Sequence, residues 1–289
     1  RGLEVCMPKT APRKRAARGL RVFVFGAGKA GAALARALAS RKVPVTLRPA
    51  RRGLPRVIDA DVVVLAVRDR DLEPLAGRLR DAHLVPRRAV VVHVAGALGP
   101  EPLAALRGAC AGVGQMHPMI SFASPRWAPE LTRGNVHVQG DPAAVTRAKR
   151  LARILGMSPR AVPGLDTIAY HAAAGLVANG AAALAAVGAE LLEKAGVAPA
   201  VAPKMLGPLL RSVAENVERL GLPEALTGPV RRGDLASLEK HLATLRAKLP
   251  HAVAFYRAAA EAQLPLARAL GDAPGESFDA IAKALATAR

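Results

Sequence analysis

The chain has 289 residues, of which 51% are hydrophobic, and this length suits a sizeable core divided between two domains. Its two cysteines, Cys6 and Cys110, exclude a disulfide framework and a cysteine-rich metal site, and they favour a cytoplasmic location. The formal net charge of +20 suits a polyanionic partner, but aromatic residues make up only 3% and no nucleic-acid motif accompanies the arginines. We therefore expect a basic, solvated surface rather than a nucleic-acid partner.

Residues 1–20 form a basic leader that we expect to be disordered, and they lack the apolar core of a signal peptide. The six residues before Met7 do not resemble a natural start, so we expect an upstream extension or a cloning remnant there. No stretch approaches the run of roughly twenty apolar residues that a membrane span needs. The sequence therefore predicts a protein that is neither exported nor embedded in a membrane.

Short apolar runs alternate with helix-forming segments in the first half of the chain. Strands are predicted over residues 21–25, 43–49, 59–69, 89–97, 112–122, 135–140 and 160–162. Helices are predicted over 30–40, over 72–81 and from Pro142, with Asp141 as the cap of the last one. This alternation predicts an α/β domain over residues 21–164, with a doubly wound, mostly parallel sheet.

The composition changes after residue 164. From Thr167 onwards, alanine, leucine and charged residues recur at helical spacing and are interrupted by glycine and proline. We expect an all-helical substrate and dimerisation domain over 165–289. Its helix over about 167–194 is apolar around much of its circumference, so it must be buried, and the interface of a homodimer is the expected place.

Gly26, Gly28 and Gly31 form a GxGxxG pattern between the first predicted strand and the first predicted helix. The first glycine permits a tight turn, the second lets a pyrophosphate approach the backbone, and the third lets the helix pack on the sheet. The phosphates would lie at the helix N-terminus, where free N–H groups favour anions. We interpret the stretch as a dinucleotide site rather than a purely structural turn, with these candidate contacts: Gly26, Ala27, Gly28, Lys29, Ala30 and Gly31.

The end of the second predicted strand indicates which dinucleotide binds. An NAD site usually places Asp or Glu there, about 20 residues after the glycines. This chain offers Arg48, Arg51 and Arg52 instead. Guanidinium groups bind a 2′-phosphate, which a carboxylate would repel. We predict NADP(H) rather than NAD(H), with Arg48 as first choice, against the alternative that these arginines belong only to the general basic surface.

Six stretches follow one another in an order typical of one family: GAGKAG, ADVVVLAVRD, VVHVAGAL, MHPMISF, YHAAAGLVANGAAAL and LTGPVRRGD. In this order the chain resembles the Rossmann-like proteins of unknown function that carry a helical C-terminal domain, within the 6-phosphogluconate and 3-hydroxyacid dehydrogenase superfamily. Pyrroline-5-carboxylate reductases and prephenate dehydrogenases are more distantly similar. The resemblance covers almost the whole chain after residue 20. It implies a nicotinamide-binding domain, a helical dimerisation domain and an active cleft between them.

The resemblance also implies positions beside the cofactor. Ala66, Val67 and Arg68 follow the third strand, where relatives bring backbone against the nicotinamide ribose. Ala95 and Gly96 end the next strand, beside the expected nicotinamide ring. The family more often has serine before this glycine, so a hydroxyl that would bind a substrate carbonyl is missing at Ala95.

His171 is the main catalytic candidate. It begins the long helix, and Asn179 lies eight residues further on, about two turns along the same face. In dehydrogenases of the superfamily, a lysine on the corresponding helix donates a proton and a nearby asparagine orients the carbonyl. A histidine can do the same acid work because its ordinary pKa of about 6.5 lies near physiological pH. The alternative is a helix N-terminal histidine that is satisfied by a backbone carbonyl.

Other side chains are weaker candidates. His117 precedes a proline and is held in an extended loop, where it either faces the cleft as a catalytic group or orders the loop. Ser121 is a candidate contact to a substrate hydroxyl. Thr227 and Arg232 precede a helix that Asp234 would cap, and Arg232 would clamp a substrate carboxylate or pair with a surface acid. The histidines and carboxylates do not show metal-ligand spacing, so no metal site is expected.

These residues together predict an NADP(H)-dependent oxidoreductase that acts on a small polar, acidic carbonyl or imine. The nicotinamide would supply the hydride, His171 the proton and Asn179 the orientation. One alternative is a non-catalytic NADP(H)-binding sensor or scaffold, which Ala95 favours. Another is a nucleic-acid partner that the basic leader recruits.

Overall fold

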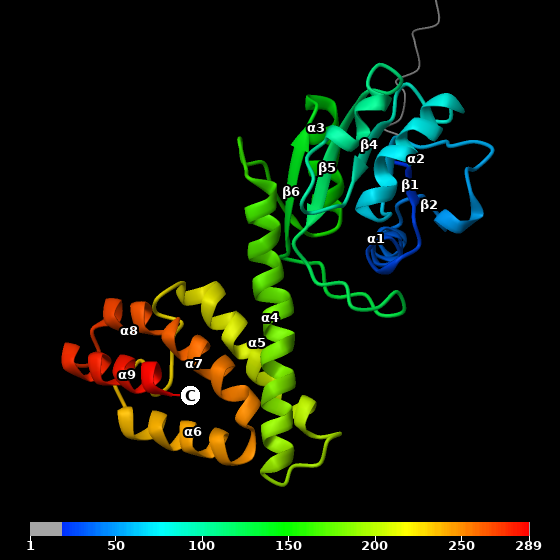
Figure 1. Ribbon diagram of the computed structural model, residues 1–289. Helices are drawn as coiled ribbons and strands as arrows, with labels where there is room; N and C mark the ends of the chain where they lie inside the picture. Colours follow the sequence, from blue (N-terminus) through cyan, green and yellow to red (C-terminus); the bar gives the residue numbers. More distant parts are fainter. Residues whose placement is uncertain (1–18, 289) are drawn as a thin grey trace, which may run out of the picture. The chain divides into compact units, whose positions relative to one another are not determined.

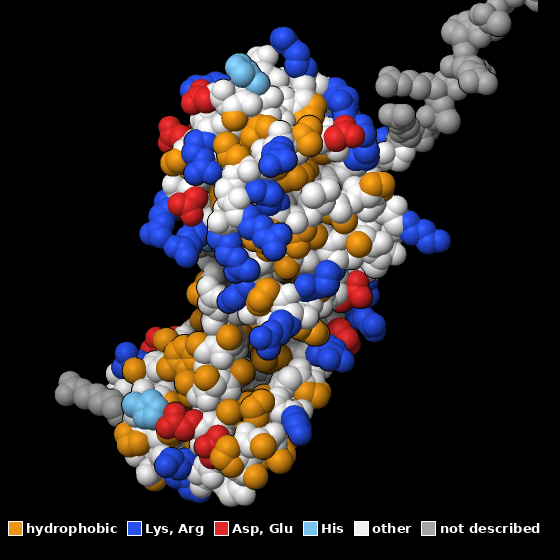
Figure 2. Space-filling view, turned by 90° about the vertical axis from the view of Figure 1, so that its right-hand side faces the viewer, with side chains coloured by type: hydrophobic (Ala, Val, Ile, Leu, Met, Phe, Trp, Pro, Cys, Tyr) orange, Lys and Arg blue, Asp and Glu red, His pale blue; other side chains and the backbone are white. Residues whose placement is uncertain are grey.

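The computed structural model describes residues 19–288, which form two compact units that divide after Ala174 (Figure 1). The division falls inside one long helix, α4 (Thr167–Lys194), ten residues beyond the boundary expected from composition. Almost all of the predicted basic leader lies outside the described residues. Figure 2 shows Lys and Arg side chains spread over the visible face and interspersed with hydrophobic ones, as expected for a basic, solvated surface.

The first unit is built of alternating strands and helices (Figure 1). Its strands are β1 (Val22–Phe25), β2 (Val45–Arg48), β3 (Val62–Leu65), β4 (Val90–His93), β5 (Gly112–Pro118), β6 (Asn135–Gly140) and β7 (Ser158–Arg160). Its α-helices are α1 (Lys29–Ser40), α2 (Asp69–Asp81) and α3 (Pro142–Ile154), with short 3₁₀ helices at η1 (Ala50–Arg52) and η2 (Glu101–Leu106).

Within the described residues the strands form one seven-stranded sheet in the order β2-β1-β3-β4-β5-β6-β7. All neighbouring pairs are parallel except β5 and β6. From β1 the chain continues to β2 on one side, and from β2 it crosses over to β3 on the other side of β1. The topological switch point therefore lies between β1 and β3. The predicted fold class, a doubly wound mostly parallel sheet followed by a helical region, is confirmed.

The central strands are buried on both faces because their residues alternate between two apolar layers. Val22 and Val24 of β1 pack with α1 and α3 on one face, whereas Phe23 and Phe25 pack with α2 and η2 on the other. The valine run of β3 divides between the same two layers. A continuous apolar run is therefore what a strand covered on both faces requires.

Two local predictions in this unit were wrong. The last strand ends at Arg160, two residues earlier than expected. Asp141 precedes α3 but does not cap it, because its carboxylate accepts a hydrogen bond from the Val113 N–H at 3.0 Å. The cause is the antiparallel pairing of β5 with β6, which brings the start of β5 next to Asp141.

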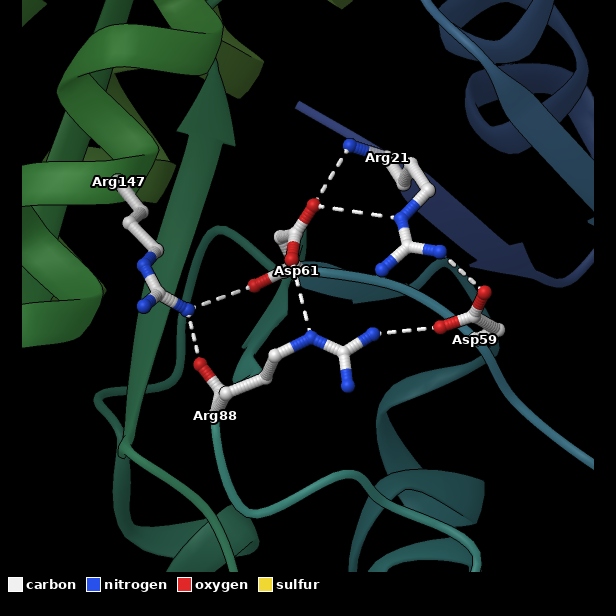
Figure 3. A network of polar contacts seen from close by, with 5 residues as sticks. All are labelled: Arg21, Asp59, Asp61, Arg88 and Arg147. Atoms are coloured by element: carbon white, nitrogen blue, oxygen red, sulfur yellow. Dashed lines mark hydrogen bonds and ion pairs between the residues drawn. The ribbon is translucent and has the colours of Figure 1, made fainter. Parts of the chain in front are cut away.

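A network of charged side chains ties the amino-terminal ends of the strands together (Figure 3). Asp61 accepts the Arg21 N–H at 3.0 Å and the Arg88 guanidinium at 3.2 Å, and Arg147 of α3 donates to the Asp61 carbonyl at 2.9 Å. Asp59 bridges Arg21 and Arg88. Burial acts to raise the pKa of Asp61, but the hydrogen bonds and charges of Arg21 and Arg88 outweigh it and lower the pKa. The carboxylate is therefore charged where three segments meet.

The second unit is helical, as expected. Besides the rest of α4 it contains α5 (Ala202–Leu220), α6 (Leu235–Lys248), η3 (Pro250–Ala252), α7 (Val253–Glu261), α8 (Leu264–Leu270) and α9 (Gly275–Thr287). A core that includes Leu238, Leu242, Phe278 and Ile281 joins α6 to α9. Asp234 caps α6 by accepting the Ser237 N–H at 3.0 Å, which confirms its predicted role.

Helix α4 differs from two expectations. It has 28 residues and contains an 18-residue stretch with a mean hydropathy of 1.6, so it is long and apolar enough to cross a membrane by length and composition, and the prediction that no stretch approaches a span was wrong. The many alanines explain this, since they raise hydropathy without forming an obvious apolar run. A single helix of this kind is weak evidence for a membrane protein. In the part of the chain that the structure describes, none of its residues is buried.

Gly31→Ala and Gly28→Ala form a matched pair of stability variants. A Cβ at Gly31 would lie within 3.0 Å of the Gly26 carbonyl oxygen, so α1 must move away from β1 and we expect the free energy of unfolding to fall by about 2–3 kcal/mol. Among the described residues nothing lies within 4 Å of a Cβ at Gly28, where φ is −72°, so we expect a loss below about 1 kcal/mol. Urea unfolding followed by circular dichroism measures both, and equal losses would contradict this packing.

Candidate functional site

The loops that follow β1, β3, β4 and β5 lie at one edge of the sheet, because these strands are parallel neighbours. A cavity of about 600 Å³ opens there beside the ends of β1, β2 and β3. Several residues predicted to bind a cofactor line it: Gly26, Ala27, Gly28, Arg51, Ala66, Val67 and Arg68. Other predicted residues are not among its lining: Lys29, Ala30, Gly31, Arg48, Arg52, Ala95 and Gly96.

Glycine is required where β1 turns into α1. Gly26 has a φ of +112°, and a Cβ there would lie within 3.0 Å of the Ala66 carbonyl oxygen. Among the described residues no side chain caps α1, and its first turn contains no acidic residue. Within the described chain, the first turn of α1 therefore has no capping side chain and no carboxylate of its own, and Gly28, at its N-terminus, lines the cavity, as an anion site needs.

Arg48 does not line this cavity, although it was the first choice for a 2′-phosphate. Its Nε donates to the Gly53 carbonyl at 2.7 Å, and its Nη2 donates to the carbonyls of Arg52 and Leu54 at 2.7 and 2.9 Å. The side chain therefore closes the loop around η1. Arg51 lies within this closed loop and contributes to the cavity wall.

Sequence reasoning missed other residues of the cavity wall: Pro49, Ala50, Arg70 and Asp71. Arg70 and Asp71 belong to the first turn of α2, directly after the loop that was assigned to the nicotinamide ribose. That position was the available signal, because a residue following the third parallel strand must emerge at the same edge as the glycine turn. The cavity thus holds Arg51, Arg68 and Arg70 against the single carboxylate of Asp71.

The loop after β4 is held firmly by buried side chains. His93 is fully buried, its Nε2 lies 2.6 Å from the Gly99 carbonyl oxygen, and its Nδ1 accepts the Ala95 N–H at 3.2 Å. Burial lowers the pKa of His93, so this ring is neutral at pH 7. Gln115 of β5 donates to the carbonyls of Ala95 and Gly96 at 2.7 and 3.3 Å. The backbone at Gly96 is therefore a fixed surface.

Three further rings gather against this surface. The rings of His117 and His171 meet edge-on with centroids 5.8 Å apart. A Cβ at Gly96 would lie within 3.0 Å of both His171 Nδ1 and His117 Nε2, so both imidazole nitrogens lie directly against this glycine and near each other. The hydroxyl oxygen of Tyr170 lies 3.1 Å from His117 Nδ1. The structure thus brings together the two predicted histidines and adds Tyr170, which the sequence analysis did not single out although it sits beside His171.

The remaining predicted residues lie elsewhere. Ser121 is exposed in the segment between β5 and β6, and Asn179 is exposed in the part of α4 that belongs to the second unit. Thr227 and Arg232 are also exposed in the second unit. The neighbouring Arg231 orders that turn instead, since it pairs with Asp272 at 2.5 Å and donates to the Leu226 carbonyl at 2.7 Å. Across residues 19–288, no group of three or more His, Cys, Asp or Glu residues is arranged to hold a metal ion.

The fold and this edge define a Rossmann-like protein with a helical second unit. Residues 135–263 match the family model described as Domain of unknown function (DUF2520), which confirms the resemblance drawn from the sequence motifs. Comparison with curated proteins gives no match.

Solved structures of other proteins share this fold. The Bacteroides fragilis protein BF3122, provisionally named an NADP oxidoreductase, is 19% identical with a TM-score of 0.66 over 85% of this chain and 98% of its own. Plasmodium falciparum pyrroline carboxylate reductase with NADP bound is 12% identical with a TM-score of 0.58, over 91% and 98%. The imine reductase from Myxococcus stipitatus in complex with NADP+ is 16% identical with a TM-score of 0.55, over 92% and 100%.

Acid should destabilise the fold partly through His117. Burial, and then the nearby His171, lower the pKa of His117 from 6.5 to about 4. The unfolded chain binds this proton below about pH 6.5 and the folded chain only below about pH 4, so stability is fully present above pH 6.5 and is lost as the pH falls toward 4. The stability lost between neutral pH and pH values below 4 is at most about 3–4 kcal/mol.

Urea unfolding of the wild type and of His117→Gln at pH 7 and pH 5 measures this contribution. We expect the wild type to lose more stability than the variant between the two pH values. Parallel losses would show that His117 titrates normally in the folded protein.

Proposed function

We propose that the protein is an NADP(H)-dependent oxidoreductase that acts on a small polar, acidic carbonyl or imine. The observation that carries the proposal is the continuity of one sheet edge, where the glycine turn and its 600 Å³ cavity are followed by the two converging histidines. The cavity has the size of a small-molecule site, which is typically about 300–1,000 Å³. The fold shared with proteins that hold NADP supports the same cofactor here.

Arg51 is the proposed ligand of the 2′-phosphate, in place of Arg48. It lies on η1 at the end of β2, where a dinucleotide places its adenosine ribose. Arg48 holds the loop by three carbonyl contacts and so presents Arg51 to the cavity. Arg68 and Arg70 add positive charge to the same wall, which outweighs Asp71. A guanidinium group at this place favours a phosphate over a free ribose hydroxyl.

The chemistry assigned to this chain is proton transfer and orientation. A bound nicotinamide would supply hydride transfer beside the loop that ends at Gly96. His171 is exposed, so it can exchange its proton with solvent and deliver it to the substrate. His117 is neutral at pH 7 and can donate a hydrogen bond. Asn179 as the orienting residue, and Ser121, Thr227 and Arg232 as substrate contacts, stay predictions.

A non-catalytic NADP(H)-binding sensor is the second candidate. The buried Ala95 favours it, because no hydroxyl at this position meets a substrate beside the ring. The two candidates differ in turnover but not in cofactor binding.

A homodimer through the helical region is part of the proposal. Met205, Leu209, Val213 and Val217 recur every four residues on α5 and are 44–58% exposed. Leu176 and Val177 of α4 are 77% and 72% exposed. Apolar stripes of this length on neighbouring helices indicate an interaction surface, and a second copy of the chain is the proposed occupant.

Titration with NADPH and NADH tests the cofactor. We expect the wild type to bind NADPH more tightly, and Arg51→Ala to weaken NADPH binding by about 10- to 100-fold with little change for NADH, because a charge-assisted phosphate contact contributes about 1.5–3 kcal/mol. Arg52→Ala is the matched control, since it removes the same charge from the same short helix outside the cavity. Binding of neither nucleotide would overturn the proposed function, and equal effects of the two variants would overturn the role of Arg51.

Leu209→Glu tests the dimer. A buried carboxylate in an apolar interface is strongly unfavourable, so we expect the variant to sediment as a monomer at concentrations where the wild type is dimeric. Arg211→Glu lies on the opposite side of α5 and should leave the dimer intact. A wild type that is monomeric at tens of micromolar would refute the proposed assembly.

A further inference from the structure

Tyr170 stands at the centre of the ring cluster at the start of α4. Its ring is 5.5 Å from that of His117, edge-on, and 5.5 Å from that of His137. The two histidines are direct cross-strand partners in the antiparallel pair of β5 and β6, so they present their rings on the same face of the sheet. Tyr170 therefore packs across a pair of imidazoles that the sheet itself holds in register.

The direction of the hydrogen bond between Tyr170 and His117 decides which ring nitrogen of His117 carries the proton. Burial raises the pKa of Tyr170, so its hydroxyl keeps its proton and can donate. The hydroxyl lies 3.1 Å from His117 Nδ1. Because His117 is neutral at pH 7, it carries one ring proton, and a ring nitrogen that accepts a hydrogen bond cannot carry it. When the Tyr170 hydroxyl donates, the proton of His117 is on Nε2, the nitrogen that lies over Gly96.

We propose that Tyr170 is a positioning residue, which holds His117 as its Nε2–H tautomer so that His117 and His171 donate to one carbonyl oxygen of the substrate above Gly96. This inference rests on the proposed function and narrows its substrate class from carbonyl or imine to carbonyl.

Two neighbouring hydrogen-bond donors favour a carbonyl substrate over an imine. A Cβ built on Gly96 would lie within 3.0 Å of both His117 Nε2 and His171 Nδ1, so the two nitrogens are at most about 5 Å apart, and one oxygen between them can reach both at hydrogen-bond distances of about 2.8 Å. A carbonyl oxygen has two lone pairs and accepts from both nitrogens. An imine nitrogen has one lone pair and leaves one donor unpaired, which weakens the binding of an imine relative to a carbonyl.

The proposed reduction needs one hydride, from the reduced nicotinamide, and one proton, from His171. The carbonyl carbon accepts a hydride from the reduced nicotinamide, and the electron pair of the C=O bond moves to oxygen. His171 transfers its Nδ1 proton to that oxygen, which gives an alcohol, and regains a proton from solvent. His117 keeps its proton and stabilises the developing negative charge, since its tautomer is fixed before the substrate arrives.

Imidazole nitrogen NMR tests the tautomer without any substrate. In ¹⁵N-labelled protein at pH 7, we expect His117 to show a protonated Nε2 and an unprotonated Nδ1, with its signals identified by their loss in His117→Gln. Tyr170→Phe should give a mixture of tautomers. A proton on Nδ1 of His117 in the wild type, or an unchanged spectrum in Tyr170→Phe, would overturn the assignment.

A second histidine–tyrosine pair supplies a matched control. The Tyr256 hydroxyl lies 2.9 Å from His241 Nδ1, and the rings meet edge-on at 6.0 Å, but this pair belongs to the second unit. Tyr256→Phe removes the same hydroxyl and should change the signals of His241 and leave those of His117 unaltered.

NADPH oxidation against a panel of 2-oxo acids and matching cyclic imines tests the substrate class. We expect turnover of 2-oxo acids, a 10- to 100-fold lower kcat in Tyr170→Phe with an unchanged KM for NADPH, and normal kinetics in Tyr256→Phe. Faster turnover of imines than of 2-oxo acids would overturn the carbonyl assignment while the oxidoreductase function stands. Failure to bind NADPH would overturn the proposed function and the carbonyl assignment together, whereas the NMR spectra still decide the role of Tyr170.

Discussion

Parallel pairing of the strands from β2 to β5 is the constraint on which the rest of the molecule depends. It places the carboxyl ends of all these strands at one edge, so loops far apart in the sequence become neighbours. The strands can pair in this way because both faces of the sheet are covered by apolar layers. The glycine turn, the arginine-lined cavity and the histidine cluster are consequences of that arrangement. If the strands lost this register, the residues that form each of these features would no longer be neighbours.

Charged side chains are balanced at one edge of the sheet and unbalanced at the other. At the amino-terminal edge, Asp59 and Asp61 neutralise Arg21 and Arg88, and the charges stabilise the fold among themselves (Figure 3). At the carboxyl edge, the described residues that line the cavity include three arginines but one carboxylate, that of Asp71. A protein with a net charge of +20 cannot pair all its cations internally. The unbalanced positive charge at this edge is what an anionic ligand would complement.

Sequence patterns predicted the sheet and the glycine turn because both depend on local residue types and spacing. The assignment of Arg48 illustrates the limit, since the pattern shows that an arginine ends β2 but not that its guanidinium folds back onto three carbonyls. Tyr170 was missed for a related reason. Its importance comes from the cross-strand pairing of His117 with His137, which places residues 20 positions apart opposite each other and cannot be counted from a motif. The spacing of α4 showed that it is apolar, but not what covers it.

The division of work between Arg48 and Arg51 bears on how coenzyme choice can change during evolution. One arginine shapes the loop and a different, exposed one faces the cavity. If Arg51 binds the 2′-phosphate as proposed, a mutation there would alter the preference between phosphorylated and unphosphorylated nucleotides without weakening the scaffold. Specificity at that position would then change almost independently of folding, because the side-chain hydrogen bonds that hold the loop come from Arg48.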